Sequence, residues 1–344
     1  MVTVRGIMKR TKLKWLVVIA SGLLVLLGCL NTIIRPLEPH YDGMPLRYWV
    51  HRTGEPGSFY SQQKTEDALK AMSVAAVPQL IRWLETPDVP LVDPLIDGFI
   101  HKCNRDLWYF AITGRRLRCL SIWALEEIGG PGNDVVPHLI ARLRDHDPLV
   151  RRSAADALWR FPVQFELTVP ALVTAMSDPD GEVRSSAAMS LGYFPAQFEV
   201  AVPVLVKVLS DPNARVRRSA VSALRHFPSQ FGIVVPVLVK AASDPDPLVR
   251  TSAVQEMRHF PDQHGTVIPT LGKAMGDPSS GVVTAAVRSL PKFGTNAFSV
   301  LPILTSLAGH PDRMVRAAAA ESLEYFGTHF PPVPITVPLP PPPK

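Results

Sequence analysis

Apolar and polar positions alternate along this chain in blocks of 33 residues. Each block begins with an apolar run such as VAVPVLVKVL at 200–209, followed by a Ser-Asp-Pro turn. A segment with apolar residues at helical spacing comes next, such as 215–226. The pattern predicts two helices per block, the first so apolar that we expect it to be sandwiched and not merely amphipathic. Its proline, Pro203 in this block, is expected in the first helical turn, where a missing N–H is harmless.

Three series of residues recur at this interval. The arginines are Arg151, Arg184, Arg217, Arg250 and Arg316, with Val283 in the remaining slot. The prolines are Pro137, Pro170, Pro203, Pro236, Pro269 and Pro302, and the phenylalanines are Phe161, Phe194, Phe227, Phe260, Phe293 and Phe326. A fixed period predicts an all-α solenoid of about seven to eight stacked helical hairpins, each burying its apolar face against its neighbours.

An Asp between the two helices and a Val-Arg pair six residues later mark each turn. This motif resembles the HEAT-repeat family in its short bacterial form, which includes lyase-type members. The resemblance implies an Asp–Arg ladder between adjacent repeats, made by Asp145, Arg151, Asp178, Arg184, Asp211, Arg217, Asp244 and Arg250. Asp277 faces Val283, and His310 stands where Asp is expected, so the ladder is expected to weaken toward the C-terminal end.

The N-terminal segments predict a membrane attachment. Residues 1–14 are basic, and residues 15–34 carry no charge over a length that matches a bilayer core. This predicts a single-pass anchor with a cytoplasmic N-terminus and extracytoplasmic repeats. Alternatively, Leu-Leu-Gly before Cys29 resembles a lipobox, which would make the protein a lipoprotein acylated at Cys29.

The rest of the chain divides into a leader, a repeat domain and a tail. Residues 35–61 resemble the leader of membrane-attached bacterial HEAT-repeat proteins, and Leu46, Trp49 and Val50 are expected to cap the first repeat. Residues 62–330 form the predicted repeat domain. The proline-rich tail 331–344 is expected to be disordered, with extended polyproline II conformation.

A long insertion at 86–115 interrupts the first repeats. It is expected to cap the stack, or to serve as a lid or docking segment. Cys103 lies in this insertion, and Cys119 occupies a repeat position that is polar elsewhere and is expected to face outward. In an oxidising compartment this predicts a Cys103–Cys119 disulfide, with two free thiols as the alternative.

Charge and motifs narrow the function classes. The net charge is +6, but residues 1–35 contribute six basic groups and no acid, so the remainder is neutral. A neutral domain argues against a nucleic-acid partner. The chain lacks the common nucleophile, phosphate-loop and zinc-protease motifs, which predicts no enzyme activity and no cofactor. His226 and His259 share one repeat position, and duplication explains them better than a metal site.

The family resemblance implies that the second helices line a concave face suited to gripping a protein partner. Candidate partner-binding residues on these helices are Arg152, Asp156, Trp159, Tyr193, Arg218, Arg225, His226, Arg258, His259 and Tyr325. The expected function is a non-enzymatic, membrane-tethered, extracytoplasmic scaffold that binds a protein. The alternatives are a lyase-like or cofactor-handling protein and a purely structural envelope protein.

Overall fold

The computed structural model describes residues 39–42, 44–53, 59–87, 114–129 and 135–330. They fall into two compact units, one ending at Arg160 and the other beginning at Phe161. Each unit is described by itself.

Unit 1 opens with a short hairpin and a capping helix. The strands β1 (His40–Tyr41) and β2 (Met44–Pro45) pair antiparallel, with Asp42 at a positive φ of 51° in the turn. Helix α2 (Leu46–Thr53) buries Leu46, Trp49 and Val50, and the Trp49 indole N–H donates to the Tyr41 carbonyl oxygen at 3.1 Å. The prediction that these three apolar side chains pack inward is confirmed.

The remaining helices of unit 1 form stacked hairpins. Helix α3 (Phe59–Ala71) and α2 both contact α6 (Gly114–Ile128), which also packs on α4 (Ser73–Leu84). The next hairpin comprises α7 (Val135–Arg142) and α8 (Pro148–Ala157), and α8 stacks on α6.

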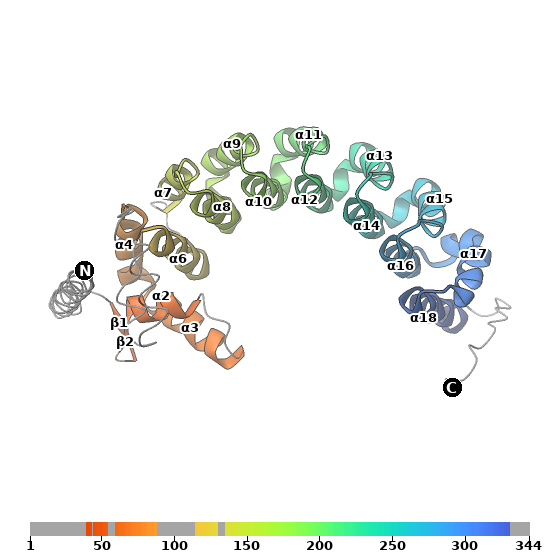
Figure 1. Ribbon diagram of the computed structural model, residues 1–344, viewed down its shortest axis with the longest axis horizontal. Helices are drawn as coiled ribbons and strands as arrows, with labels where there is room; N and C mark the ends of the chain where they lie inside the picture. The colour runs from red at the N-terminus through yellow and green to blue at the C-terminus, as the bar shows by residue number, and fades with distance from the viewer. Residues whose placement is uncertain (1–38, 43, 54–58, 88–113, 130–134, 331–344) are drawn as a thin grey trace, which may run out of the picture. The chain divides into compact units, whose positions relative to one another are not determined.

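Unit 2 contains five helical hairpins in two layers (Figure 1). The first helices are α9 (Phe165–Ala175), α11 (Phe198–Val208), α13 (Phe231–Ala241), α15 (His264–Ala274) and α17 (Leu301–Ser306). The second helices are α10 (Gly181–Leu191), α12 (Ala214–Leu224), α14 (Pro247–Glu256), α16 (Ser280–Ser289) and α18 (Arg313–His329). Consecutive second helices contact one another directly, as a solenoid requires.

The core of unit 2 lies between these two layers. Leu205, Leu238 and Leu271 point inward from successive first helices with no exposed surface, and Val216 and Val249 meet them from the second helices. The period of 33 residues therefore corresponds to one layer of core per repeat. The predicted all-α solenoid is present, with the β1–β2 hairpin as its one departure among the described residues.

The first helices are not sandwiched, contrary to the prediction. Leu167, Val200 and Ile233 are 52%, 47% and 50% exposed, so one face of the first-helix layer remains open to solvent. The pattern misled because apolar residues also occupy this outer face. Each of α9, α11 and α13 packs on its own second helix and touches a first helix beside it, and only its outer face is uncovered.

The repeated proline also lies deeper in its helix than predicted. Pro203 is the sixth residue of α11, because the 3₁₀ turn η5 (Pro195–Gln197) leads directly into Phe198 and lengthens the helix at its start. The proline is exposed, so the Glu199 carbonyl that loses its helical partner can bond to water. Pro170, Pro236 and Pro269 are internal in the same way.

Phe-Pro pairs end the second helices as predicted. Phe194 and Phe227 are buried with φ near −115° and ψ of 62° and 55°, outside the α region that a following proline disfavours. Each phenylalanine thereby fills the core at the turn between one hairpin and the next.

Several predictions fall outside the described residues. These are the basic flank 1–14, the anchor 15–34 with Cys29, the first part of the leader, most of the insertion 86–115 with Cys103, and the tail 331–344. In the part of the chain that is described, no single helix is long and apolar enough to cross a membrane. Helix α10 and the stretch Pro195–Val208 reach that length only together, with a bend of 98° between them.

Candidate functional site

Arginine and aspartate side chains link successive repeats of unit 2. Arg184, Arg217 and Arg250 each hydrogen-bond to the aspartate that lies 27 residues later: Asp211, Asp244 and Asp277, respectively. Both carboxylate oxygens are engaged, with N–O distances of 2.7–2.9 Å. These planar pairs are charge-assisted and bidentate, the strongest kind of protein hydrogen bond.

Each ladder residue also holds its own turn. Arg217 Nη1 donates to the Asp211 carbonyl oxygen at 2.9 Å, and Asp244 Oδ1 accepts the Asp246 N–H at 2.9 Å. Burial raises the pKa of Asp244, but the hydrogen bonds from Arg217 and Asp246 and the charges of Arg217 and Arg250 outweigh it. The net pKa lies below its ordinary value. The ladder therefore fixes the fold, and its arginines are not free to bind a partner.

The ladder is longer than the sequence motif indicated. In unit 1, Arg118 Nε lies 3.0 Å from Asp145 Oδ2, and both side chains are almost completely buried. Asp277 is a ladder member because its partner Arg250 comes from the preceding repeat, so Val283 removes only the following rung. At that position His310 Nδ1 accepts the Asp312 N–H at 3.0 Å, as aspartate does elsewhere.

A cluster of candidate residues surrounds one buried acid, Glu256, whose carboxylate lies at the end of α14. Arg225 Nη1 is 3.5 Å from Glu256 Oε1, and His259 Nε2 is 3.5 Å from Oε2. The ring of Tyr193 packs on His226 with centroids 5.0 Å apart. Burial raises the pKa of Glu256 and lowers the pKa of His226 and of His259. The structure thus brings together five residues, of which only Glu256 was absent from the sequence candidates.

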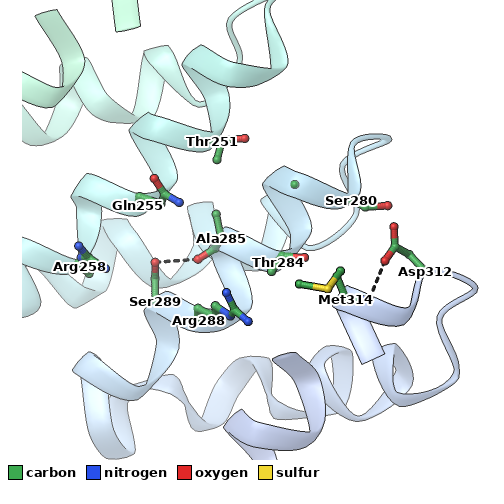
Figure 2. A pocket seen from close by; sticks show the side chains of 11 residues that line it. Thr251, Gln255, Arg258, Ser280, Thr284, Ala285, Arg288, Ser289, Asp312 and Met314 are labelled. Carbon is green, nitrogen blue, oxygen red and sulfur yellow. Dashed lines mark hydrogen bonds between the residues drawn. The ribbon is translucent and has the colours of Figure 1, made fainter. Parts of the chain in front are cut away.

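A pocket of about 550 Å³ opens on the second helices next to this cluster (Figure 2). The Arg258 side chain lies at one end, and Asp312 and Met314 from the start of α18 lie at the other. Hydroxyl and amide groups line the space between them, contributed by Thr251, Gln255, Ser280, Thr284 and Ser289. Arg288 of α16 also lines it, and sequence reasoning missed this residue although it stands 33 positions after Gln255.

The candidate residues of unit 1 form contacts of their own. Arg152 and Asp156 are paired along α8, with Nε and Oδ2 3.6 Å apart. The Arg160 guanidinium lies 4.3 Å from the centre of the Trp159 ring. Arg160 also approaches Glu126 at 3.8 Å, and burial raises the pKa of Glu126. These residues lie on the surface of unit 1 but are largely satisfied within it.

The two remaining candidates differ in their surroundings. Arg218 is exposed on α12. Tyr325 packs against the end of its own helix, where its ring stacks on His329 at 4.2 Å and meets Phe330 edge-on. Tyr325 therefore stabilises the C-terminal end of α18.

The predicted Cys103–Cys119 disulfide involves Cys103, which lies outside the described residues; among those described, Cys119 carries a free thiol. Its side chain does not face outward but is half-buried against α8, where it hydrogen-bonds to Ser153. Ser185 and Ser219 make the equivalent contact two repeats later, with their hydroxyl oxygens 2.8 Å apart. The position that looked exposed in sequence is thus a contact between successive second helices, and burial raises the pKa of the Cys119 thiol.

No group of three or more His, Cys, Asp and Glu side chains within the described residues is arranged to hold a metal ion. His226 contacts Tyr193 and Arg225, whereas His259 contacts Glu256 and Arg258.

Comparison with known proteins places this architecture in a family. A model of HEAT repeats matches residues 169–232 and 235–324, and a second HEAT-repeat model matches residues 135–161. Together they cover more than half of the 344 residues. The chain therefore belongs to the HEAT-repeat family.

Three solved structures show similarity to the chain at low sequence identity. The complex of CpcE and CpcF of phycocyanin lyase from Nostoc sp. PCC7120 matches at 18% identity and a TM-score of 0.39, over 70% of this chain and 95% of that one. YibA from E. coli matches at 15% identity and a TM-score of 0.49, over 83% of this chain and 93% of that one. The HEAT-like repeat protein of Thermococcus onnurineus NA1 matches at 14% identity and a TM-score of 0.45, over 60% of this chain and 93% of that one. A search of curated proteins found none that matches this chain.

Proposed function

We propose that this protein is a non-enzymatic scaffold that binds a protein partner on the second helices of unit 2. The proposal includes attachment to a membrane through residues 15–34, or through a lipid on Cys29, with the repeats outside the cytoplasm. The uncharged stretch behind a basic N-terminus supports this attachment.

The observation that carries the proposal is the contrast between core and surface positions of the second helices. Positions facing the core repeat with little change, as in Val216 and Val249, because packing fixes them. The solvent-facing positions three to four residues apart change more. Arg218 is replaced by Thr251 and Thr284 in the next two repeats, and Ser222 by Gln255 and Arg288, whereas Arg225 recurs once as Arg258. We call these eight residues the second-helix row.

The row has the composition of a binding surface. It combines arginines with hydroxyl and amide groups on rigid helices, and it borders the Tyr193–His226 ring contact. Tyrosine and arginine are enriched among the residues that dominate binding energy at protein interfaces. Because the helices are fixed by the ladder and the core, such a surface loses little conformational entropy on binding.

Site-specific photocrosslinking tests the proposal. A photoreactive amino acid is placed at Ser222, Gln255 or Arg288 in the full chain expressed in its native host. The matched controls place it at Lys207, Lys240 or Lys273, which are exposed at equivalent repeat positions on the first helices. One common protein adduct from the second-helix set and none from the first-helix set is expected. Adducts from the first helices alone, or no adduct from either set, would refute the proposed surface.

A further inference from the structure

The pocket in Figure 2 has an unusual balance of charge. Two of its lining side chains are cationic, Arg258 and Arg288, and both are exposed. Its acid, Asp312, accepts the Met314 N–H at 2.7 Å and bonds to Ser280, so that it serves as the N-cap of α18. The Thr251 and Ser289 hydroxyls donate to backbone carbonyls of their own helices. The polar groups left to meet a ligand are thus the two guanidinium groups, the Gln255 amide and the Thr284 hydroxyl.

These two arginines differ from five others on or beside the second helices, which are held by acidic side chains. Arg184, Arg217 and Arg250 are held by ladder aspartates, Arg215 by Glu182, and Arg225 by Glu256. Within the described residues, neither Arg258 nor Arg288 has an ion pair, and Arg218 in the same row has none either. The Arg258 Nε–H donates only to the neutral partner His259, at 3.4 Å.

The unit that carries this pocket is neutral overall. Residues 161–330 contain 14 Lys or Arg and 14 Asp or Glu. A neutral unit lacks the broad positive field by which proteins attract nucleic acids. A localised group of guanidiniums in a polar pocket instead suits carboxylates, which arginine binds bidentately.

The spacing of the arginines favours a chain of carboxylates over a single anion. Arg258, just after α14, and Arg288, on α16, belong to successive repeats, and packed helices lie about 8–10 Å apart. An extended polypeptide advances about 3.3 Å per residue, so three residues span roughly 10 Å. Two acidic side chains three residues apart would therefore meet Arg258 and Arg288 together.

From this geometry we infer that the second-helix row binds an extended acidic segment of the partner protein, with Arg258 and Arg288 receiving its carboxylates in the pocket. The inference rests on the proposed function and adds the chemistry of the partner. Gln255 and Thr284 would hydrogen-bond the backbone of the bound segment.

Binding of a labelled model peptide to the purified full chain tests the inference. The probe is a twelve-residue peptide with glutamate at every third position, compared with glutamine and lysine versions of the same peptide. The variant is R258Q/R288Q, and the matched control is K240Q/K273Q, which removes the same charge from the first helices. All four positions are exposed, so the thermal unfolding midpoint should not change and serves as a check of folding.

The parent and K240Q/K273Q are expected to bind the glutamate peptide with the same Kd, within twofold. R258Q/R288Q should bind it at least tenfold more weakly, and added salt should weaken the parent more than this variant. Neither the glutamine nor the lysine peptide should compete. Absence of glutamate-peptide binding, or equal weakening in both double variants, would overturn the inference.

Two competitors separate the other ligand classes. Tighter binding of an oligothymidylate than of the glutamate peptide would overturn the inference in favour of a nucleic acid. Equally effective competition by inorganic phosphate would reduce the pocket to a simple anion site. If a crosslinked adduct at Gln255 persists unchanged in R258Q/R288Q, the inference of an acidic segment is wrong while the proposed function stands. If the parent gives no adduct, the proposed function itself fails.

Discussion

Arg217 and Asp244 lie 27 residues apart in sequence and are joined by two hydrogen bonds of 2.7 and 2.8 Å. The arginine also binds the carbonyl oxygens of Asp211 and Pro212 in its own turn. One guanidinium therefore couples the inter-helix turns of two successive repeats. The same arrangement at Arg184 and Arg250 makes the turns a continuous structural edge of unit 2.

Removing one aspartate of this ladder should destabilise the stack. Asp244→Ala leaves the Arg217 guanidinium largely buried and without its carboxylate, and we expect a loss of about 2 kcal/mol in the free energy of unfolding. Urea denaturation followed by circular dichroism measures it. Glu182→Ala is the control, because its ion pair with Arg215 is much more exposed and should contribute about 0–1 kcal/mol. Equal losses in the two variants would contradict the ladder's structural role.

The ladder also predicts an acid limit to stability. The pKa values of Asp211, Asp244 and Asp277 in the folded state lie below their ordinary value of 3.8, because arginine hydrogen bonds outweigh burial. As pH falls, the aspartates of the unfolded chain are protonated before those of the folded chain. The stabilisation is therefore present above about pH 4 and is lost as pH falls through the lower pKa values of the folded state. Urea midpoints measured between pH 6 and pH 3 should fall, and Asp244→Asn should flatten this fall. An unchanged slope in that variant would show that Asp244 does not contribute.

Gly192 should not tolerate a larger side chain. A Cβ at this position would lie 2.9 Å from Ala223 Cβ and 3.0 Å from its Cα, which is backbone of the neighbouring α12. We therefore expect Gly192→Ala to lower the free energy of unfolding by about 1–3 kcal/mol through overpacking. Gly232→Ala in α13 is the matched control, since a Cβ there meets nothing within 4 Å and should be neutral or slightly stabilising. Thermal unfolding of the two variants distinguishes the cases, and similar midpoints would contradict this close helix approach.

The core layer of each repeat should be sensitive to truncation. Leu238 has no exposed surface, and Leu238→Ala is expected to cost about 2–5 kcal/mol in the free energy of unfolding. Val200→Ala on the outer face of α11 should cost under about 0.5 kcal/mol, because Val200 is 47% exposed. Urea midpoints of both variants measure the difference. A loss at Val200 as large as that at Leu238 would mean that the outer face is covered in solution.

Much of the fold followed from the period alone, because a repeat that recurs every 33 residues must place equivalent side chains in equivalent surroundings. The helices around Val216, the core phenylalanines such as Phe227, and the capping residues Leu46, Trp49 and Val50 are where the pattern predicted them. The buried side of each first helix was not predictable, since Val200 and Leu205 are equally apolar. The depth of Pro203 depended on the 3₁₀ turn before it.

The candidate site was less accessible to sequence reasoning. The motif pairs Asp with the arginine six residues later, whereas the side-chain bonds join arginine to the aspartate of the next repeat, which made Asp277 a ladder residue. Cys119 appeared to be outward because its equivalents are polar, yet that position contacts the next second helix. Recognising the pocket as a binding site required knowing which arginines have no ion pair. The sequence does not show these pairs, so it did not single out Arg288.

Hydrogen–deuterium exchange on the full chain, with and without the protein identified by crosslinking at Gln255, tests the central claim most directly. Protection on binding should appear in α12, α14 and α16, with α11, α13 and α15 unchanged. Because the two sets of helices alternate along the same repeats, each protected helix has an internal control beside it. Protection confined to the first helices would contradict the second-helix row as the binding surface.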